Sequence, residues 1–414
     1  MSHQEGVATP GRTKISNITG DQVQRLLVKL DHILPHLRRH SLLPPPLQEL
    51  IPQQSKLYEH GESVTSGGGG KHVLQEVSIL EHLRRVGAWQ ENGEDQSTTR
   101  TLAIELGAGT GRLSDRLSRC KRNFSYLLID RQEFSESSCR DRHIRARLQE
   151  TPQKNQIPDA KETVVQRETV DIAALDWNKY LSFSKSDSSS STKQCCFCMS
   201  KHLCGPASDM AIDSLESIAP QSQRPACAVA TCCHYLCTWE HFSGKAFWNA
   251  LGLDSEAFLV AAAASQWASL GKPLSRRKNG GQHPSEDTTD NFIHESQRIE
   301  PDFSANQSSL TKSKDCIASH GNAFWLPDLM HMATEIASEH RSGAANHTPS
   351  RTLIPSREFE KSFTRTEKEI LGKQAKQLLD LARAARLQEL GYKVQLVRYT
   401  SQSVEDRLLV ASMD

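Results

Sequence analysis

The residues best suited to ligand binding form one glycine-rich segment, ELGAGTG, from Glu105 to Gly111. Glycines in a tight turn let the backbone approach a ligand closely and adopt conformations that a Cβ would block. A helix that begins directly after the turn offers free N–H groups to a carboxylate or another anion. An acidic side chain at the end of the following strand can accept ribose hydroxyls. We therefore predict a nucleoside-binding site made of Glu105, Gly107, Gly109, Gly111 and Asp130.

The spacing of the glycines indicates which nucleoside is bound. The segment is GxGxG, and Arg112 stands where the GxGxxG pattern of nicotinamide dinucleotide sites has its third glycine. A glutamate two residues before the first glycine, followed by GxGxG, resembles the first motif of S-adenosylmethionine-dependent methyltransferases. A plain tight turn in an α/β protein is the alternative. The spacing favours S-adenosylmethionine as the cofactor.

A second segment with reactive side chains, KHLCG, ends the fourth predicted strand with Lys201 and His202. In an open α/β sheet the carboxyl ends of the strands line the ligand crevice, so we expect both side chains near the transferred group. Enzymes that methylate exocyclic amines usually carry Asn/Asp-Pro-Pro-Tyr at this point. Its absence from this chain favours a hydroxyl or another acceptor.

The fifth predicted strand ends in a cysteine-rich segment, TCCHYLC, that contains His234. Three interpretations remain open: a zinc set, the lining of the substrate pocket, or buried core thiols. The zinc set would combine Cys204 with Cys233, His234 and Cys237. Because this spacing is a weaker signal than paired CxxC motifs, we predict no metal. We expect His234 to face the same space as Lys201 and His202.

The elements that must position these side chains follow an α/β order. A short apolar run at 101–106, the glycine turn, a helix at 112–120 and a strand at 124–129 form a βαβ unit. Further strands are predicted at 164–172, 195–203 and 226–234. The end of the chain predicts a helix at 367–390 and a hairpin-like pair of strands at 393–399 and 407–411. Amphipathic helices are predicted earlier, at 21–37 and 72–86.

Composition limits the class of protein and its partners. The chain has 414 residues with 50 Lys and Arg against 49 Asp and Glu, so any polyanion must be held by local basic patches. Mean hydropathy is −0.54, which fits a normal core diluted by polar insertions, expected near 182–192, 272–314 and 339–356. With a polar start and no long apolar run, we expect a soluble intracellular protein of the cytoplasm or nucleus without membrane contact. We predict a helical, flexible segment at 1–70 and a catalytic domain at 71–414.

In their order along the chain, these motifs resemble the tRNA methyltransferase 13 family. The resemblance covers roughly 71–270 and 357–414, and its most specific parts are KHLCG and TCCHxxC. It continues through Lys71-His72, Gln75, ELGAGTG, LLIDR, Asp171-Ile172, Asp209, Trp239, Lys376, Asp380, Arg383, Tyr399 and Glu405. Family members usually begin with small Cys/His zinc modules, whereas residues 1–70 contain no cysteine. We expect this chain to lack those modules.

The resemblance implies a fold, a reaction and a substrate. The fold is a Rossmann-like, mostly parallel seven-stranded sheet with an antiparallel last strand. The reaction is 2′-O-methylation of nucleotide 4 in the tRNA acceptor stem by S-adenosylmethionine. Asp171 and Ile172, at the end of the third strand, are expected to bind the adenine. Methylation of a protein or small molecule, or a non-catalytic scaffold, is the alternative, and no protein partner can be deduced.

Two further sets of residues are candidates for the chemistry and for RNA contact. A base that removes the hydroxyl proton would be Lys201, His202 or His234. The alternative is that Lys201 holds a phosphate and that a histidine only caps a strand end. A-form RNA is bound through shape and phosphate contacts. The dense basic run expected to contribute is Arg140, Arg142, Arg145 and Arg147, although most such runs are merely solvated faces.

Overall fold

The computed structural model describes residues 18–39, 70–89, 99–149, 163–181, 193–218, 224–269, 325–343, 363–400, 403 and 405–413. All of these belong to one compact unit, formed by Met1–Gly271 and Phe324–Asp414. The predicted boundary at residue 70 adjoins residues outside these ranges. The insertions predicted at 182–192 and 272–314, and all but the first five residues of the one at 339–356, also lie outside them.

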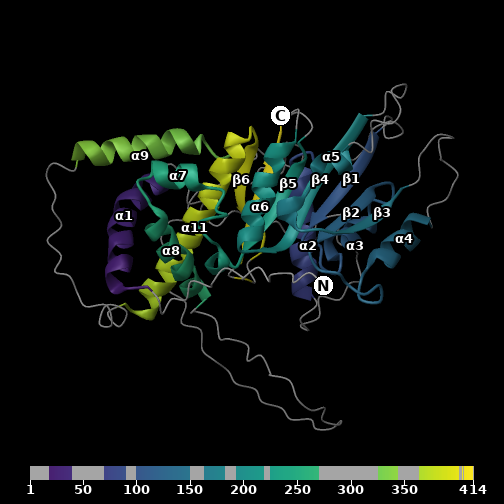
Figure 1. Ribbon diagram of the computed structural model, residues 1–414, viewed down its shortest axis with the longest axis horizontal. Helices are drawn as coiled ribbons and strands as arrows, with labels where there is room; N and C mark the ends of the chain where they lie inside the picture. The colour runs from purple at the N-terminus through teal and green to yellow at the C-terminus, as the bar shows by residue number, and fades with distance from the viewer. Residues whose placement is uncertain are drawn as a thin grey trace, which may run out of the picture. The chain divides into compact units, whose positions relative to one another are not determined.

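Within the described residues, seven strands form one sheet (Figure 1). Its order is β3-β2-β1-β4-β5-β7-β6. The first five strands in this order pair in parallel, whereas β7 pairs antiparallel with both β5 and β6. The predicted sheet, mostly parallel with an antiparallel last strand, is therefore confirmed. The strands are β1 Thr99–Leu106, β2 Ser125–Asp130, β3 Val165–Thr169, β4 Lys193–Cys204, β5 Ala226–Cys232, β6 Lys393–Arg398 and β7 Arg407–Ser412.

Helices cover both faces of the sheet because alternate strand residues point to opposite sides. In β1, Ala103 belongs to one buried cluster and Ile104 to the other. The cluster around Ala103 includes residues of α2 (Gly70–Arg85), α3 (Arg112–Ser118) and α4 (Asp141–Gln149). The cluster around Ile104 is larger and includes α1 (Gly20–Arg39), α5 (Trp177–Leu181), α6 (Pro206–Ser214), α7 (Lys245–Ala250), α8 (Ser255–Ala264), α9 (Leu329–Gly343) and α11 (Arg365–Glu389).

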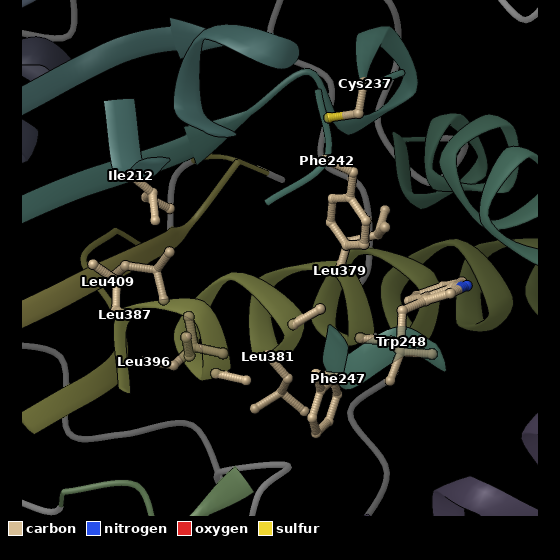
Figure 2. Packing of buried hydrophobic residues seen from close by; sticks show 14 of the residues in the cluster. Ile212, Cys237, Phe242, Phe247, Trp248, Leu379, Leu381, Leu387, Leu396 and Leu409 are labelled. Carbon is tan, nitrogen blue, oxygen red and sulfur yellow. The ribbon is translucent and has the colours of Figure 1, made fainter. Parts of the chain in front are cut away.

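The long helix α11 is central to the larger cluster. A capping box between Thr364 and Glu367 fixes its start. Figure 2 shows its leucines, among them Leu379 and Leu387, packed between side chains of β6 and β7 and the aromatic residues that follow β5. Gly372 allows close approach, since a Cβ there would collide with the backbone of Trp267 and Ala268. The helix thus ties the sheet to the smaller helices outside it.

The strands and helices predicted from the sequence are present and differ mainly at their ends, whereas the helices α4 to α9 were not predicted. The third strand stops at Thr169 rather than at residue 172, because Asp171 caps a single helical turn, Ile172–Ala174. The fifth strand stops at Cys232 rather than at His234, because Cys233 has a left-handed backbone with φ 50°. Among the described helices, none is both long and apolar enough to cross a membrane.

Candidate active site

The glycine loop follows β1 and has a conformation that only glycine adopts easily. Gly107, Gly109 and Gly111 have φ values of 63°, 53° and 82°. A Cβ on Gly107 would lie 2.7 Å from a methyl carbon of Leu203, and one on Gly111 would lie 2.6 Å from a methyl carbon of Leu128. A Cβ on Gly109 would meet no atom within 4 Å. The space beside Gly109 is therefore where a ligand can approach the backbone.

Glu105 supports this loop from beneath. Its carboxylate accepts hydrogen bonds from the backbone N–H groups of Leu113 (3.3 Å) and Ser114 (2.9 Å), at the start of α3. The side chain is buried, and burial raises the pKa of Glu105 to about 7. Since both carboxylate oxygens bind the helix, Glu105 fixes the loop rather than offering a free ligand group.

Asp130 lies beside the loop, as the sequence predicts. Its carboxylate accepts hydrogen bonds from the N–H groups of Gly109 (2.8 Å) and Gln132 (2.9 Å). The residue is half-buried, and each carboxylate oxygen can accept a further hydrogen bond. Both oxygens therefore retain capacity for the hydroxyls of a nucleoside.

The next strand along the sheet brings Asp171 to the same edge. One carboxylate oxygen of Asp171 accepts a hydrogen bond from the N–H of Ala173 (3.0 Å), and the residue is exposed. Ile172 is 7 % exposed and packs into the larger cluster, so little of it remains open to a ligand. Both residues lie past the end of β3, one strand away from Asp130.

Arg167 holds the loop from β3, a contact that sequence reasoning missed. It donates one hydrogen bond to the carbonyl oxygen of Gly109 (2.9 Å) and two to Asp141 (2.8 Å each). The hydrogen bonds to Asp141 raise the pKa of the guanidinium. Sequence spacing gives no reason to pair a strand arginine with an aspartate 26 positions before it. This contact could therefore be found only in the structure.

Lys201, the first candidate base, contacts α2 rather than an open crevice. Its Nζ lies 3.3 Å from Glu76 Oε1 and 3.2 Å from the carbonyl oxygen of His72. The residue is 6 % exposed, and burial lowers the pKa of its ammonium. Glu76 also accepts a hydrogen bond from Arg112 (2.8 Å) at the start of α3. Lys201 therefore joins the end of β4 to the helices of the smaller cluster.

His202, the second candidate, is exposed at the same strand end. Its carbonyl oxygen lies 4.0 Å from the position of a Cβ on Gly107, so it adjoins the glycine loop. Partial burial of the ring and the positive neighbours Lys201 and His72 lower the pKa of His202. A lowered pKa leaves the imidazole neutral near pH 7, the form that accepts a proton.

His234, the third candidate, is buried against α11. It is 1 % exposed, and its Nε2 lies 2.7 Å from Asp380 Oδ1. Its Nδ1 lies 3.8 Å from Glu405 Oε2. Lys201 and His234 therefore contact helices of different buried clusters, α2 and α11. That all three candidates face one space stays a prediction.

His234 belongs to a buried polar network that continues through α11. Arg383 donates two hydrogen bonds to Asp209 (3.0 and 2.8 Å) and one to Asp380 (3.2 Å). It also contacts the sulfur of Cys237 at 2.9 Å. Burial raises the pKa of Asp380, but His234 and Arg383 outweigh it, and the net shift is downward. Residues of α6, of the segment after β5 and of α11 thus meet in one network, a clustering that sequence spacing did not reveal.

The cysteines near the strand ends gather differently from the set considered on sequence. His234 forms a hydrogen bond with Asp380, and the sulfur of Cys237 contacts Arg383. The sulfur atoms of Cys204, Cys232 and Cys233 instead lie within 4.8 Å of one another. The prediction of no metal considered Cys204, Cys233, His234 and Cys237 as ligands, and the structure groups Cys204 and Cys233 with Cys232 instead.

Three of the four arginines proposed for RNA contact bind within the chain. Arg140 and Arg147 pair with Asp115 at 3.0 and 2.6 Å. Arg145 donates to the carbonyl oxygen of Val165 (3.3 Å). Arg142 is exposed on α4. Arg142 is therefore the member of this run most available to a partner.

Comparison with known proteins gives one family. The model of the family described as Methyltransferase TRM13 matches residues 74–412. A protein of Schizosaccharomyces pombe named tRNA:m(4)X modification enzyme TRM13 is 31 % identical over 195 residues, which are 46 % of each chain. A Mus musculus protein named tRNA:m(4)X modification enzyme TRM13 homolog is 23 % identical over 313 residues, 62 % of this chain and 55 % of the relative. The chain spans about half the length of the curated relatives it matches. No solved structure gives a significant match.

Proposed function

The chain belongs to the TRM13 methyltransferase family, and on that basis we propose that it methylates the ribose 2′-hydroxyl of nucleotide 4 in the tRNA acceptor stem, with S-adenosylmethionine as methyl donor. The observation that carries this proposal is the extent of the family match. It runs from α2 to β7 and includes the glycine loop and the ends of β4 and β5. The names of the matched relatives supply the substrate class, tRNA.

The cofactor binds, in this proposal, at the carboxyl edge of β1, β2 and β3. The open space beside Gly109 admits the ligand, and Asp130 accepts from the ribose hydroxyls. Asp171 accepts from the adenine amino group, while the small exposed part of Ile172 contacts the ring. Glu105 and Arg167 contribute indirectly, because they hold the loop in its binding conformation.

Two effects of the chain's own residues account for the rate. S-adenosylmethionine, when bound, supplies a methyl group on a positively charged sulfur. The strand ends hold the ribose oxygen in line with that methyl group, an effect that reaches roughly 7–11 kcal/mol in well-oriented reactions. A base that takes the hydroxyl proton adds about 10²–10⁴-fold.

We assign the role of base to His202. The residue is exposed, its backbone carbonyl adjoins the glycine loop, and its imidazole is neutral near pH 7 because its pKa is lowered. Lys201 and His234 each have buried partners, so we assign them to positioning: Lys201 fixes the strand end on α2, and His234 fixes it on α11.

The RNA is held by local basic side chains, since the whole chain carries a net charge of +1. Arg142 is the member of the arginine run that we place against phosphates, because it is exposed. The acceptor stem presents its 2′-hydroxyls in a shallow minor groove, which suits binding through shape and phosphate contacts. The protein would meet its substrate inside the cell, in the cytoplasm or nucleus.

Methyl transfer measured with labelled S-adenosylmethionine tests this function. We expect label in tRNA and none in a protein extract freed of tRNA. Label in the extract alone would favour a protein substrate. Failure to bind S-adenosylmethionine in calorimetry, with the protein folded, would favour a non-catalytic scaffold.

A further inference from the structure

Three thiols from two neighbouring strand ends converge on one point. Cys204 is the last residue of β4, Cys232 is the last residue of β5, and Cys233 follows it. The three sulfur atoms lie within 4.8 Å of one another, and those of Cys204 and Cys232 are 3.1 Å apart. All three cysteines are free, and a sulfur distance of 3.1 Å exceeds the 2.03–2.05 Å of a disulfide. The cluster thus offers three separate sulfur ligands.

The backbone at Cys233 is what brings two consecutive cysteines to the same side. Successive residues of a strand point to opposite faces, so Cys232 and Cys233 would diverge in an extended chain. Cys233 instead has φ 50°, the only positive φ outside glycine in the described residues. Such a conformation is uncommon for a residue with a Cβ and costs free energy. Its consequence here is that both sulfur atoms face Cys204.

We propose that Cys204, Cys232 and Cys233 together bind one divalent cation that prefers thiolate ligands, Zn²⁺. At the usual Zn–S distance of 2.3 Å, tetrahedral coordination places sulfur atoms about 3.8 Å apart. The sulfur atoms of Cys204 and Cys232 are closer than that, at 3.1 Å, and no pair in the cluster is more than 4.8 Å apart, so small side-chain shifts would complete the site. The three thiols release their protons on binding, and one position stays open for water or a further ligand.

The surroundings of the cluster fit binding better than simple core packing. Cys232 is 6 % exposed, whereas Cys204 and Cys233 are half-buried and give an ion a path from solvent. A bound ion would join the carboxyl ends of β4 and β5 and stabilise the left-handed turn that leads into His234. Neither the ligand set nor the proposal depends on the substrate or the reaction proposed above.

Titration of the reduced, metal-free chain with Co²⁺ tests the site. Thiolate ligands give cobalt a charge-transfer absorption in the near ultraviolet, which we expect to saturate at one equivalent and to disappear on addition of Zn²⁺. Cys204→Ser and Cys233→Asn should each lower the affinity more than about 100-fold, since even partners outside the coordination shell cost 10–100-fold. Asparagine is the choice at 233 because it tolerates positive φ.

The exposed Cys120 supplies the matched control, and Cys120→Ser should leave the titration unchanged. Absence of the charge-transfer band in the wild-type chain, or a band that survives in both cluster variants, would overturn the proposal. Should the variants fail to fold, alkylation of the wild-type chain decides the matter. Zn²⁺ should then protect Cys204 and Cys233 but not Cys120, and equal labelling of all three with and without Zn²⁺ would refute the site.

Discussion

Among single residues, a substitution at Gly109 tests most clearly where the cofactor binds, because a second glycine of similar geometry controls for backbone strain. Its φ is 53° and a Cβ there would meet nothing within 4 Å, so Gly109→Val should strain the loop and fill the space that the cofactor needs. We expect loss of S-adenosylmethionine binding in calorimetry. Gly252 is the matched control, with φ 73° and the same open surroundings in a turn after α7.

In this comparison Gly252→Val should cost similar stability but keep the cofactor affinity. Unchanged affinity in a folded Gly109→Val protein would show that the cofactor lies elsewhere.

The buried carboxyl group of Glu105 predicts a pH dependence of stability. Burial raises its pKa from 4.5 to about 7, so the folded chain keeps a proton that the unfolded chain releases between these values. Its contribution to stability is complete below pH 4.5 and is lost as pH rises through 7. Glu105→Gln removes this titration. The free energy of unfolding of the variant, relative to wild type, should therefore rise by up to about 3 kcal/mol between pH 4 and 8.

Urea unfolding at several pH values measures this difference. Glu369→Gln is the control, because Glu369 is paired with Lys373 on the surface and its pKa is lowered rather than raised. It should show no such rise. A constant difference for Glu105→Gln across this pH range would contradict the account of its burial.

Single residues also show how far the sequence can be read. The glycine loop and Asp130 were predictable because their chemistry depends on local spacing and on one strand following another. The buried surroundings of His234 were not, because they depend on Asp380 in a helix 146 positions away. The convergence of Cys232 and Cys233 needed a left-handed residue that no local pattern indicated.

At the scale of elements, the arginines of α4 divide into structural and available ones. Arg147 pairs with Asp115, which is 3 % exposed in α3, whereas Arg142 is exposed. Arg147→Ala should loosen the packing of α3 against α4 and lower the free energy of unfolding by roughly 1–3 kcal/mol. Arg142→Ala should leave stability within about 0.5 kcal/mol and weaken tRNA binding.

Denaturant unfolding and tRNA binding at two salt concentrations compare the two variants. If Arg142 contacts a phosphate, its loss should also reduce the salt dependence of binding. Normal tRNA affinity and salt dependence in Arg142→Ala would place the RNA on another surface.

The strand ends were the least predictable part of the elements. The order of the strands along the chain follows from apolar runs and turn residues, and the structure confirms it. β3 and β5 end earlier than predicted, because Asp171 caps a helical turn and Cys233 leaves the strand conformation. Both positions lie at the carboxyl edge of the sheet. In open α/β sheets this edge lines the ligand crevice, and its residues need not pair with a neighbouring strand.

At the scale of the whole molecule, the buried network of α11 connects the sheet with the outer helices. Arg383 is fully buried between Asp209 and Asp380. Arg383→Met would leave the buried carboxylate of Asp209 without its cation and that of Asp380 with His234 alone, and we expect a loss of about 3–5 kcal/mol in the free energy of unfolding. Lys373→Met, in an exposed pair with Glu369 on the same helix, should cost only about 0.3–0.5 kcal/mol.

Thermal or denaturant unfolding measures both variants. A cost for Arg383→Met no larger than that of Lys373→Met would show that the network does not hold the molecule together. Adding Asp209→Asn and Asp380→Asn to Arg383→Met should recover part of the loss, since the buried charges are then gone.

The sequence identified the class of sheet and the family, because both rest on motifs in a fixed order along the chain. It did not show that Asp209, His234, Asp380 and Arg383 form one network. The contact of His234 with Asp380 spans 146 positions, and that of Asp209 with Arg383 spans 174. That network holds the ends of β4 and β5 in place. We propose that the methyl acceptor binds beside these strand ends.

The most direct measurement maps the methyl group on tRNA after incubation with the protein and S-adenosylmethionine. Nuclease digestion and mass spectrometry should find one added methyl group on the ribose of nucleotide 4. An otherwise identical tRNA with deoxyribose at that nucleotide should acquire none. A methyl group on a base, on another nucleotide, or on the deoxyribose-containing tRNA would contradict the account.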